Sequence, residues 1–78
     1  MGTTIYDEGY RSIVMQLKAA RKRRGLTQAE AARMIGHSFG WWSKWETFQI
    51  RIDVVQFVRL CEILGLNSGR LIRMLEKG

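Results

Sequence analysis

The chain has 78 residues, 46% hydrophobic and 26% charged, which is the composition of one globular domain and excludes a disordered segment. Thirteen Lys and Arg residues against seven acidic residues give a formal net charge of +6, which favours a polyanionic partner, either nucleic acid or an acidic membrane surface. The single cysteine excludes an internal disulfide and a cysteine-based zinc site. Because the chain has no signal peptide and no apolar run of membrane length, we expect it in the cytoplasm.

The first predicted elements are a flexible N-terminal arm, residues 1–7, and an amphipathic helix that runs to about Arg24. Apolar residues recur in this helix at spacings of three and four from Tyr10 to Ala20. Its last turn is rich in Lys and Arg, and Gly25 follows. Cations near the negative end of the helix dipole and a glycine at the exit indicate the end of a helix.

Two short helices follow, joined by a tight turn. A capping box that begins at Thr27 predicts a helix over 28–35, which ends at Gly36. Ser38 is expected to cap a third helix over 39–47. Two helices joined by about three residues have the geometry of a helix-turn-helix, whose second helix can enter the major groove of DNA. This spacing alone is weak evidence, because many helical bundles share it.

The rest of the chain predicts two further helices. Asp53 is expected to cap the fourth helix, and Gly65 to close it; Asn67 or Ser68 caps the fifth. The chain contains no strand pattern, repeat or low-complexity segment. We therefore predict an all-α, five-helix fold with a single domain over 8–78.

All three tryptophans of the chain lie in the predicted third helix. At about 100° per residue, Trp41, Trp42 and Trp45 fall within one arc of the helix surface. We expect Trp42 and Trp45 to pack in the core as structural residues, whereas Trp41, at the edge of the arc, could touch a DNA backbone. The opposite side holds the remaining residues available to a partner: Phe39, Gly40, Ser43, Lys44 and Thr47.

The segment GLTQAEAARMIGHSFGWWSKWE, residues 25–46, resembles the helix-turn-helix of the phage repressor and Cro family, also called XRE-type regulators. The matching residues are Gly25-Leu26-Thr27-Gln28, Glu30, Ala32, Ile35-Gly36, Ser43-Lys44 and Glu46. The likeness continues through RIDVVQFVRLCEILGL and covers about residues 10–76. It implies a compact domain of the lambda-repressor-like type, with the helix-turn-helix at about 28–47. It also implies binding to double-stranded DNA, usually as a homodimer on an inverted repeat.

The resemblance implies roles for individual residues as well. Gln28 would bind a phosphate and hold the recognition helix in place. Three positions would read bases: Phe39, Gly40 and Lys44. Others would face phosphates: Ser43, Thr47 and, from the loop that follows, Gln49 and Arg51. Arg21 and Glu46 match a pair that forms a buried salt bridge in some relatives, so both are expected to be structural.

Phe39 and Gly40 depart from the family pattern, which often has polar residues at these positions. A phenyl ring cannot hydrogen-bond a base edge but can pack on a thymine methyl group, and Gly40 lets the backbone approach the DNA closely. Direct readout would then depend on Lys44, with guanine as its expected target, and DNA shape could add specificity. Alternatively, the register differs, and His37 or Ser38 reaches the base edges.

Other basic residues allow two interpretations, DNA contact or ordinary surface charge near helix ends: Lys22, Arg23, Arg24 and Arg33. His37 is expected to be a turn residue or a phosphate contact, and Cys61 a structural thiol. The sequence predicts no metal site, no cofactor and no small-molecule effector. It contains no Gly-rich phosphate loop and no nucleophile–base pairing, so we do not expect an enzyme.

The expected function is transcriptional regulation, most simply repression by a homodimer that occupies a promoter. One such role is autorepression of a phage or mobile-element operon, such as an anti-CRISPR-associated one. The predicted dimer interface lies in the C-terminal helices, where apolar residues exceed the needs of a small core: Val54, Phe57, Ile72, Met74 and Leu75. The alternative is an antitoxin-type protein-interaction module that neutralises a toxin, with DNA binding secondary. A membrane-surface protein is disfavoured, because the basic residues are spread over several short helices.

Overall fold

The computed structural model describes residues 7–77 of the chain, with side chains described as far as Leu75. In this range all regular structure is helical, which confirms the predicted all-α fold class. Every helix in it is too short or too polar to span a bilayer. The helices in chain order are α1 (Glu8–Arg23), α2 (Gln28–Ile35), α3 (Phe39–Glu46), α4 (Val54–Leu64) and α5 (Ser68–Lys77).

Helices α2 to α5 begin after capping residues that the sequence predicts, and α1 begins after Asp7. The N-caps are Asp7, Thr27, Ser38, Asp53 and Asn67. Asn67 caps α5 through its side-chain oxygen, which accepts a hydrogen bond from the Arg70 amide at 2.9 Å; this decides between the two caps left open. Of the predicted N-terminal arm, residues 1–7, all but Asp7 lie outside the described residues. Each cap satisfies an amide of the first turn that has no partner within the helix.

Two helices end one residue earlier than predicted. Arg24 and Thr47 are the C-caps of α1 and α3, rather than their last helical residues. After α3, Phe48 takes a left-handed conformation with φ of 65°, a position that glycine usually fills. The Gln49 amide then donates a hydrogen bond to the Lys44 carbonyl at 2.8 Å. The sequence has no glycine at this exit, so the exact end of α3 could not be read from it.

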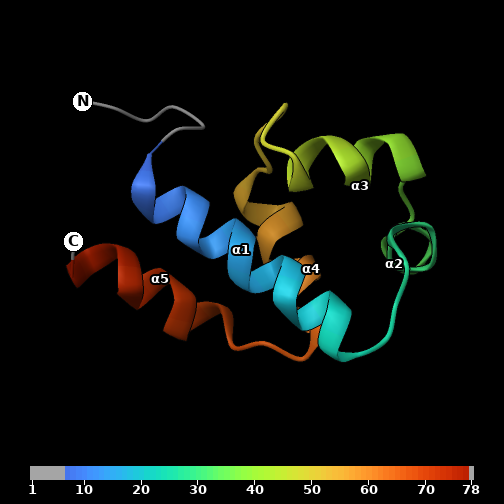
Figure 1. Ribbon diagram of the computed structural model, residues 1–78. Coiled ribbons are helices and arrows are strands. Elements are labelled where there is room, and N and C mark those ends of the chain that lie inside the picture. Colours follow the sequence, from blue (N-terminus) through green and yellow to red (C-terminus); the bar gives the residue numbers. More distant parts are fainter. Residues whose placement is uncertain (1–6, 78) are drawn as a thin grey trace.

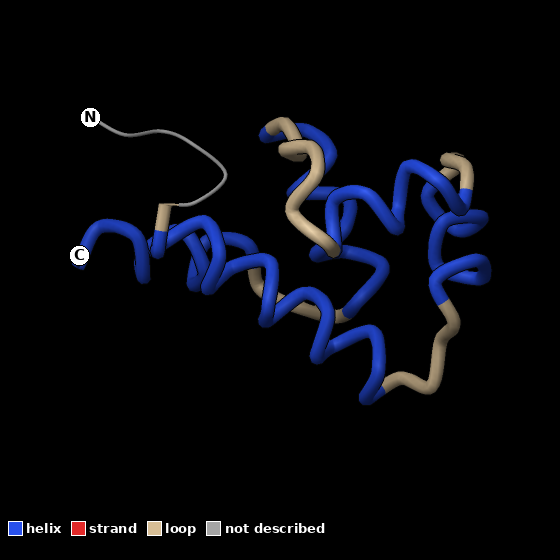
Figure 2. The backbone as a smooth tube through the Cα atoms, turned by 45° about the horizontal axis from the view of Figure 1, so that its top comes forward, coloured by secondary structure: helices blue, strands red, loops and turns tan. Residues whose placement is uncertain are grey.

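Figure 1 shows α1 running through the middle of the molecule, with α2 and α3 at one end and α5 beside the start of α1. α4 packs against α1, α2 and α5. The tube in Figure 2 shows the same arrangement from another side, with α5 again next to the start of α1. The molecule measures 34 × 23 × 20 Å.

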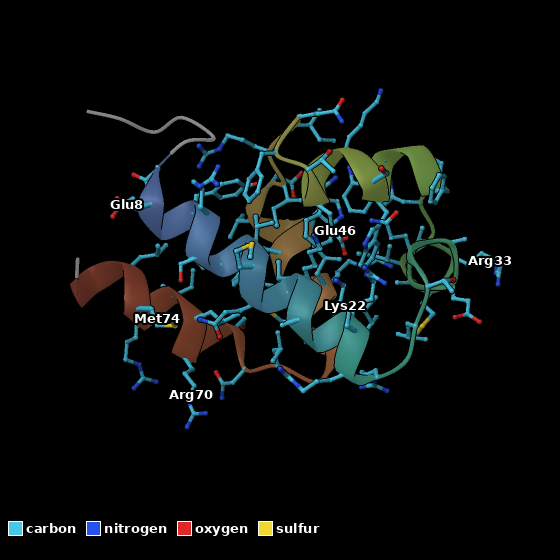
Figure 3. All side chains as sticks on the ribbon, viewed as in Figure 1. Glu8, Lys22, Arg33, Glu46, Arg70 and Met74 are labelled. Atoms are coloured by element: carbon cyan, nitrogen blue, oxygen red, sulfur yellow. The ribbon has the colours of Figure 1, made fainter. Side chains whose placement is uncertain are left out.

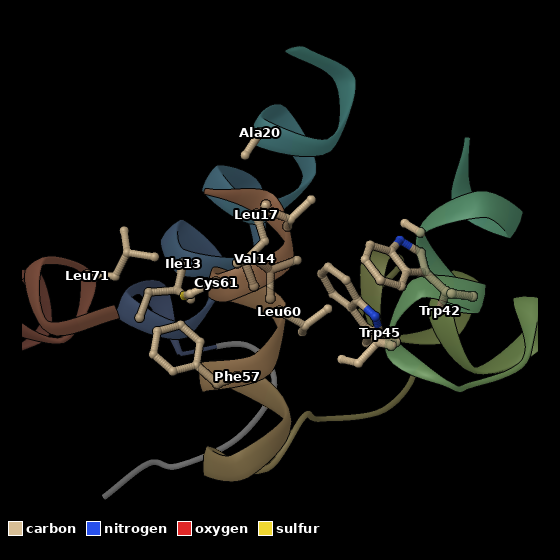
Figure 4. Packing of buried hydrophobic residues seen from close by; sticks show 14 of the residues in the cluster. Ile13, Val14, Leu17, Ala20, Trp42, Trp45, Phe57, Leu60, Cys61 and Leu71 are labelled. Atoms are coloured by element: carbon tan, nitrogen blue, oxygen red, sulfur yellow. The ribbon is translucent and has the colours of Figure 1, made fainter. Parts of the chain in front are cut away.

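One cluster of buried apolar side chains joins these helices (Figure 4). Val14 and Leu17 of α1 and Leu60 of α4 have no exposed surface. Trp42 and Trp45 lie at one end of the cluster in Figure 4, and Leu71 of α5 lies at the other. The core therefore runs from α3 to α5, and α1 and α4 form its middle.

Cys61 belongs to this core and is free. Burial, with a smaller contribution from the charge of Glu62, raises the pKa of its thiol to about 11. A thiol that remains protonated at neutral pH is a poor nucleophile. This agrees with a packing role for Cys61.

The residues expected at a C-terminal interface do not all lie on the surface. Phe57 was expected there, but it is buried at 6% exposure and packs in the core, because it points inward from α4. The other four residues are exposed: Val54, Ile72, Met74 and Leu75. Two more exposed aliphatic residues of α4 accompany them, Val55 and Val58. We call these six exposed residues the α4–α5 apolar set.

Candidate nucleic-acid interface

The turn between α2 and α3 consists of residues 36–38 and is closed by backbone hydrogen bonds. Gly36 has a φ of 79°, a conformation that side-chain-bearing residues adopt only with strain. The next amide, of His37, donates to the Ala32 carbonyl at 2.9 Å. Ser38 then caps α3 by accepting a hydrogen bond from the Trp41 amide at 3.1 Å. This turn fixes the direction in which α3 leaves α2.

Two tryptophans hold the inner side of α3 against the core. Trp42 and Trp45 are 0% exposed, and their ring centroids lie 4.9 Å apart. Burial of both rings removes a large apolar area from water, and this stabilises α3 in its position against the core. The indole nitrogen of Trp45 is buried and has no hydrogen-bond partner among the described residues. That of Trp42 donates to Glu46.

Glu46, the last residue of α3, lies at the centre of a buried polar network. Its carboxylate accepts hydrogen bonds from Arg21 of α1, at 2.7 Å from Nε and at 3.3 Å from Nη2. It also accepts hydrogen bonds from Gln28 Nε2 at 2.7 Å and from Trp42 Nε1 at 2.8 Å. The remaining Arg21 Nη1 donates to the Leu26 carbonyl at 2.7 Å. One carboxylate thus joins α1, α2 and α3, and charge-assisted bonds of this kind are short and geometrically specific.

The network also sets the ionisation of Glu46. Burial by itself would raise the pKa of this carboxyl group, but hydrogen bonds from Arg21, Trp42 and Gln28, together with the Arg21 charge, outweigh it. The net effect holds the pKa of Glu46 below its ordinary value of 4.5. The carboxylate is therefore charged at neutral pH and is paired with Arg21.

The outer side of α3 is open and carries positive charge. Phe39 and Lys44 are exposed, as is Gly40 between them in sequence. The only acidic residue of α3 is Glu46, which is 2% exposed, so no carboxylate faces outward from this helix. Figure 1 shows α3 at the edge of the molecule. A helix that is fixed inside and cationic outside suits contact with a polyanion.

A family model described as a helix-turn-helix domain matches residues 13–75. The chain belongs to the helix-turn-helix domain family. In this helix-turn-helix domain, α2 and α3 form the two helices on either side of the turn. A helix-turn-helix domain implies DNA binding and suggests a DNA-binding regulator. A search of curated proteins gave no match.

The predicted contact residues lie in α2, in the turn, in α3 and in the loop that follows. Several of these polar groups are bonded within the protein. The Thr47 hydroxyl donates to the Ser43 carbonyl at 2.8 Å, and Gln49 Nε2 donates to Thr47 Oγ1 at 2.8 Å. Gln28, predicted to bind a phosphate, donates one hydrogen bond to Glu46. Lys44 is exposed, and its ammonium group makes no ion pair among the described residues.

Trp41 and His37 form a stacked pair that sequence reasoning missed. Their ring centroids lie 3.9 Å apart at an interplanar angle of 19°. Trp41 is partly buried, whereas His37 is exposed. The two residues are four positions apart, a spacing that brings side chains together within a helix. However, His37 lies in the turn before the helix, where helical spacing does not apply.

The remaining basic candidates lie in different surroundings. Arg51 sits over the ring of Tyr10, with its guanidinium carbon 4.4 Å from the centroid. The Arg24 guanidinium lies against Gly65 at the end of α4, where it would be 3.2 Å from an added Cβ. Arg33 projects from α2 at the edge of the molecule in Figure 3. Of the predicted cations, Lys44 is the one on α3.

The described residues offer no alternative site with metal chemistry. Among the side chains that the structure describes, residues 7–75, no group of three or more His, Cys, Asp and Glu residues is placed to hold an ion. One hollow in the surface is an apolar groove between the start of α1, the start of α4 and α5. Its lining includes Tyr10, Val54, Phe57 and Ile72.

Proposed function

We propose that this protein is a sequence-specific transcriptional regulator of the phage repressor and Cro, or XRE, type. It places α3 in the major groove of double-stranded DNA. The observation that carries the proposal is the contrast between the two sides of α3. Its inner side is fixed by Trp42, Trp45 and the Glu46 network, and its outer side presents Lys44 with no exposed carboxylate. A recognition helix needs this combination of rigidity and uncovered surface.

The net charge supports the same function. A charge of +6 on 78 residues attracts the phosphate backbone over a range set by the salt concentration. Phosphate contacts orient such a protein on the duplex, and contacts to base edges supply the specificity. Lys44, as a donor with no acceptor, is suited to the O6 and N7 atoms of guanine.

We further propose a homodimer on an inverted repeat, paired through the α4–α5 apolar set. One recognition helix reads only a few base pairs, and two related by a dyad double the site. Val54 and Ile72, which both line the apolar groove, are 69% and 39% exposed. A second copy of this chain would remove that apolar surface from water. The pairing would leave α3 free, because the six residues lie on α4 and α5.

In this proposal the protein is a non-catalytic repressor that acts in the cytoplasm by occupying a promoter. Its own operon in a phage or mobile element, such as an anti-CRISPR-associated one, is the simplest target. The proposal includes no effector, and occupancy then follows the protein concentration relative to the dissociation constant of the operator.

The test is selection of binding sites from a random duplex library at near-physiological salt, with the wild-type protein and two variants. We expect an inverted repeat with half-site centres about 10 base pairs apart. Lys44→Ala should alter the preferred base at one position of each half-site. Arg70→Ala removes the same charge from α5, where Arg70 points away from the molecule (Figure 3), and should leave the selected sequence unchanged.

Two results would contradict the proposal. Salt-sensitive binding without any enriched sequence would mean non-specific association, and would direct the search to a protein partner. A monomer by sedimentation, at the concentration where the operator is bound, would contradict the homodimer.

A further inference from the structure

The outer side of α3 presents two side chains of opposite chemistry to a partner. Phe39, at the first position of the helix, is 56% exposed. Lys44 follows on the other flank of the same side, about 140° around the helix axis at 100° per residue. Gly40, Ser43 and Thr47 lie between them, and the Thr47 hydroxyl already donates to the Ser43 carbonyl. The two flanks of this outer side therefore carry a phenyl ring and an ammonium group.

The contacts described within the chain give Phe39 no role in folding. It is exposed and is not part of the core cluster. Among the described residues its ring takes part in no aromatic pair, although His37 and Trp41 stack on each other two residues to either side. Space beside it is also open, since a Cβ on Gly40 would meet nothing closer than Ser38 Oγ at 3.9 Å. An exposed phenyl ring at this point has apolar area available for a ligand.

The major groove offers one kind of apolar group, the 5-methyl group of a pyrimidine. Thymine always carries it, and cytosine carries it when methylated at C5. We infer that Phe39 packs on a pyrimidine 5-methyl group at one fixed position of each half-site, so that binding depends on thymine there and responds to cytosine methylation. The inference rests on the proposed function, because it requires α3 to lie in the major groove.

The first arm of the test removes only the methyl group. In the selected operator, each thymine is replaced in turn by deoxyuridine, and affinity is measured by fluorescence anisotropy. The wild-type protein is expected to bind about fourfold more weakly when one particular thymine of each half-site is replaced, because the burial of one methyl group is lost. Phe39→Ala should bind the thymine and deoxyuridine duplexes equally well. Met34→Ala, which removes an exposed side chain from α2, is the matched control and should keep the full penalty.

The second arm distinguishes the two sources of the methyl group. The critical T·A pair is changed to C·G, and that cytosine is then methylated at C5. Methylation should raise the affinity of the wild-type protein for this duplex about fourfold. It should leave the affinity of Phe39→Ala unchanged. Thermal unfolding of Phe39→Ala checks that the variant keeps its fold, as expected for an exposed residue.

Failure of this inference is distinguishable from failure of the proposed function. A deoxyuridine penalty that persists in Phe39→Ala, or no penalty at any thymine, would overturn the role of Phe39 while the operator is still bound. An operator whose half-sites lack a fixed thymine would do the same. If no operator is selected at all, the proposed function fails first, and the inference falls with it.

Discussion

At one end of the molecule, where α2 and α3 meet α1, buried polar groups and two tryptophans fix the helices. At the other end, where α4 begins and α5 lies beside α1, aliphatic side chains remain exposed. Glu46 receives bonds from three other residues at the first end. At the second end, α1 and α5 are joined by a hydrogen bond from Gln16 Nε2 to Met74 Sδ at 3.2 Å. A thioether sulfur is a weak acceptor. The first end is organised as a rigid surface, and the second leaves apolar area uncovered.

Under the function proposed above, the two ends would carry out two different tasks. A recognition helix gains specificity from a fixed orientation, which a network of short charge-assisted bonds provides. An interface between copies gains affinity from apolar area, which needs no internal network. The following variants change one end at a time.

The largest expected effect is at Trp45. Trp45→Ala should lower the free energy of unfolding by about 3–5 kcal/mol, because it removes a fully buried ring and leaves a cavity. Urea denaturation followed by circular dichroism measures this loss. Phe39→Ala, at an exposed ring of the same helix, should cost less than about 1 kcal/mol. Trp45→Ala with an unchanged melting temperature but no DNA binding would show that the indole is not a core residue.

Loss of the Glu46 carboxylate should have the next largest effect. Glu46→Ala leaves Arg21 buried without its counter-charge and is expected to cost about 3 kcal/mol of unfolding free energy. Glu62→Ala, at an exposed position of α4, is the control and should change stability by less than about 0.5 kcal/mol. Equal losses for the two variants would contradict a structural role of the network.

The network should also make stability depend on pH in the acid range. The pKa of Glu46 is lowered in the folded protein, so below the ordinary value of 4.5 the unfolded chain takes up a proton that the folded protein does not. The contribution of Glu46 is therefore complete above that pH and is lost as the pH falls through the folded pKa. The stability difference between wild type and Glu46→Gln should shrink over this range. A constant difference from pH 7 to pH 3 would contradict the account.

A matched pair of tryptophan variants isolates the hydrogen bond from the packing. Trp42→Phe and Trp45→Phe each replace a fully buried indole by a phenyl ring. Only Trp42 loses a bond to a carboxylate, whereas Trp45→Phe removes an indole N–H that has no partner. Trp42→Phe should therefore cost about 2 kcal/mol more in unfolding free energy than Trp45→Phe. The opposite order would mean that packing, not the network, dominates at this end.

The smallest effect on folding is expected at the other end. Val54→Ser with Val55→Ser changes two side chains that are 69% and 65% exposed, so the stability of the monomer should change by less than about 0.5 kcal/mol. The dimer dissociation constant, from sedimentation equilibrium, should rise at least about tenfold. Met34→Ser, at an exposed position of α2, is the control and should leave dimerisation unchanged.

Local chemistry explains why most of the fold could be predicted. A cap and a periodic apolar pattern act within one or two turns of a helix, so Thr27, Ser38 and Asp53 located helix starts correctly. The turn at Gly36 was equally readable, because only glycine adopts its backbone conformation without strain. Phe48 shows the limit. It holds a left-handed conformation, while Arg11 lies 4.3 Å from its ring centroid, and neither feature has a local signature.

The candidate site was predictable as a surface but not in its internal bonds. Helical rotation alone places Phe39 and Lys44 on the side of α3 opposite Trp42 and Trp45. The bond from Gln28 to Glu46 and the position of Arg51 over Tyr10 depend on how distant segments pack. The resemblance to known repressors supplied the pairing of Arg21 with Glu46, which composition and spacing could not.

The most direct test of the contrast between the two ends is an NMR titration of the ¹⁵N-labelled protein with its selected operator duplex. Chemical-shift changes on adding DNA should be concentrated at the turn, on α3 and in the loop after it. The signals of Val54, Val55 and α5 should change little, because the proposed dimer already forms in the free protein. The three indole N–H signals provide an internal comparison, since Trp41 should respond more than the fully buried Trp42 and Trp45. Changes centred on α4 and α5, with α3 unaffected, would contradict the assignment of DNA to the helix-turn-helix end.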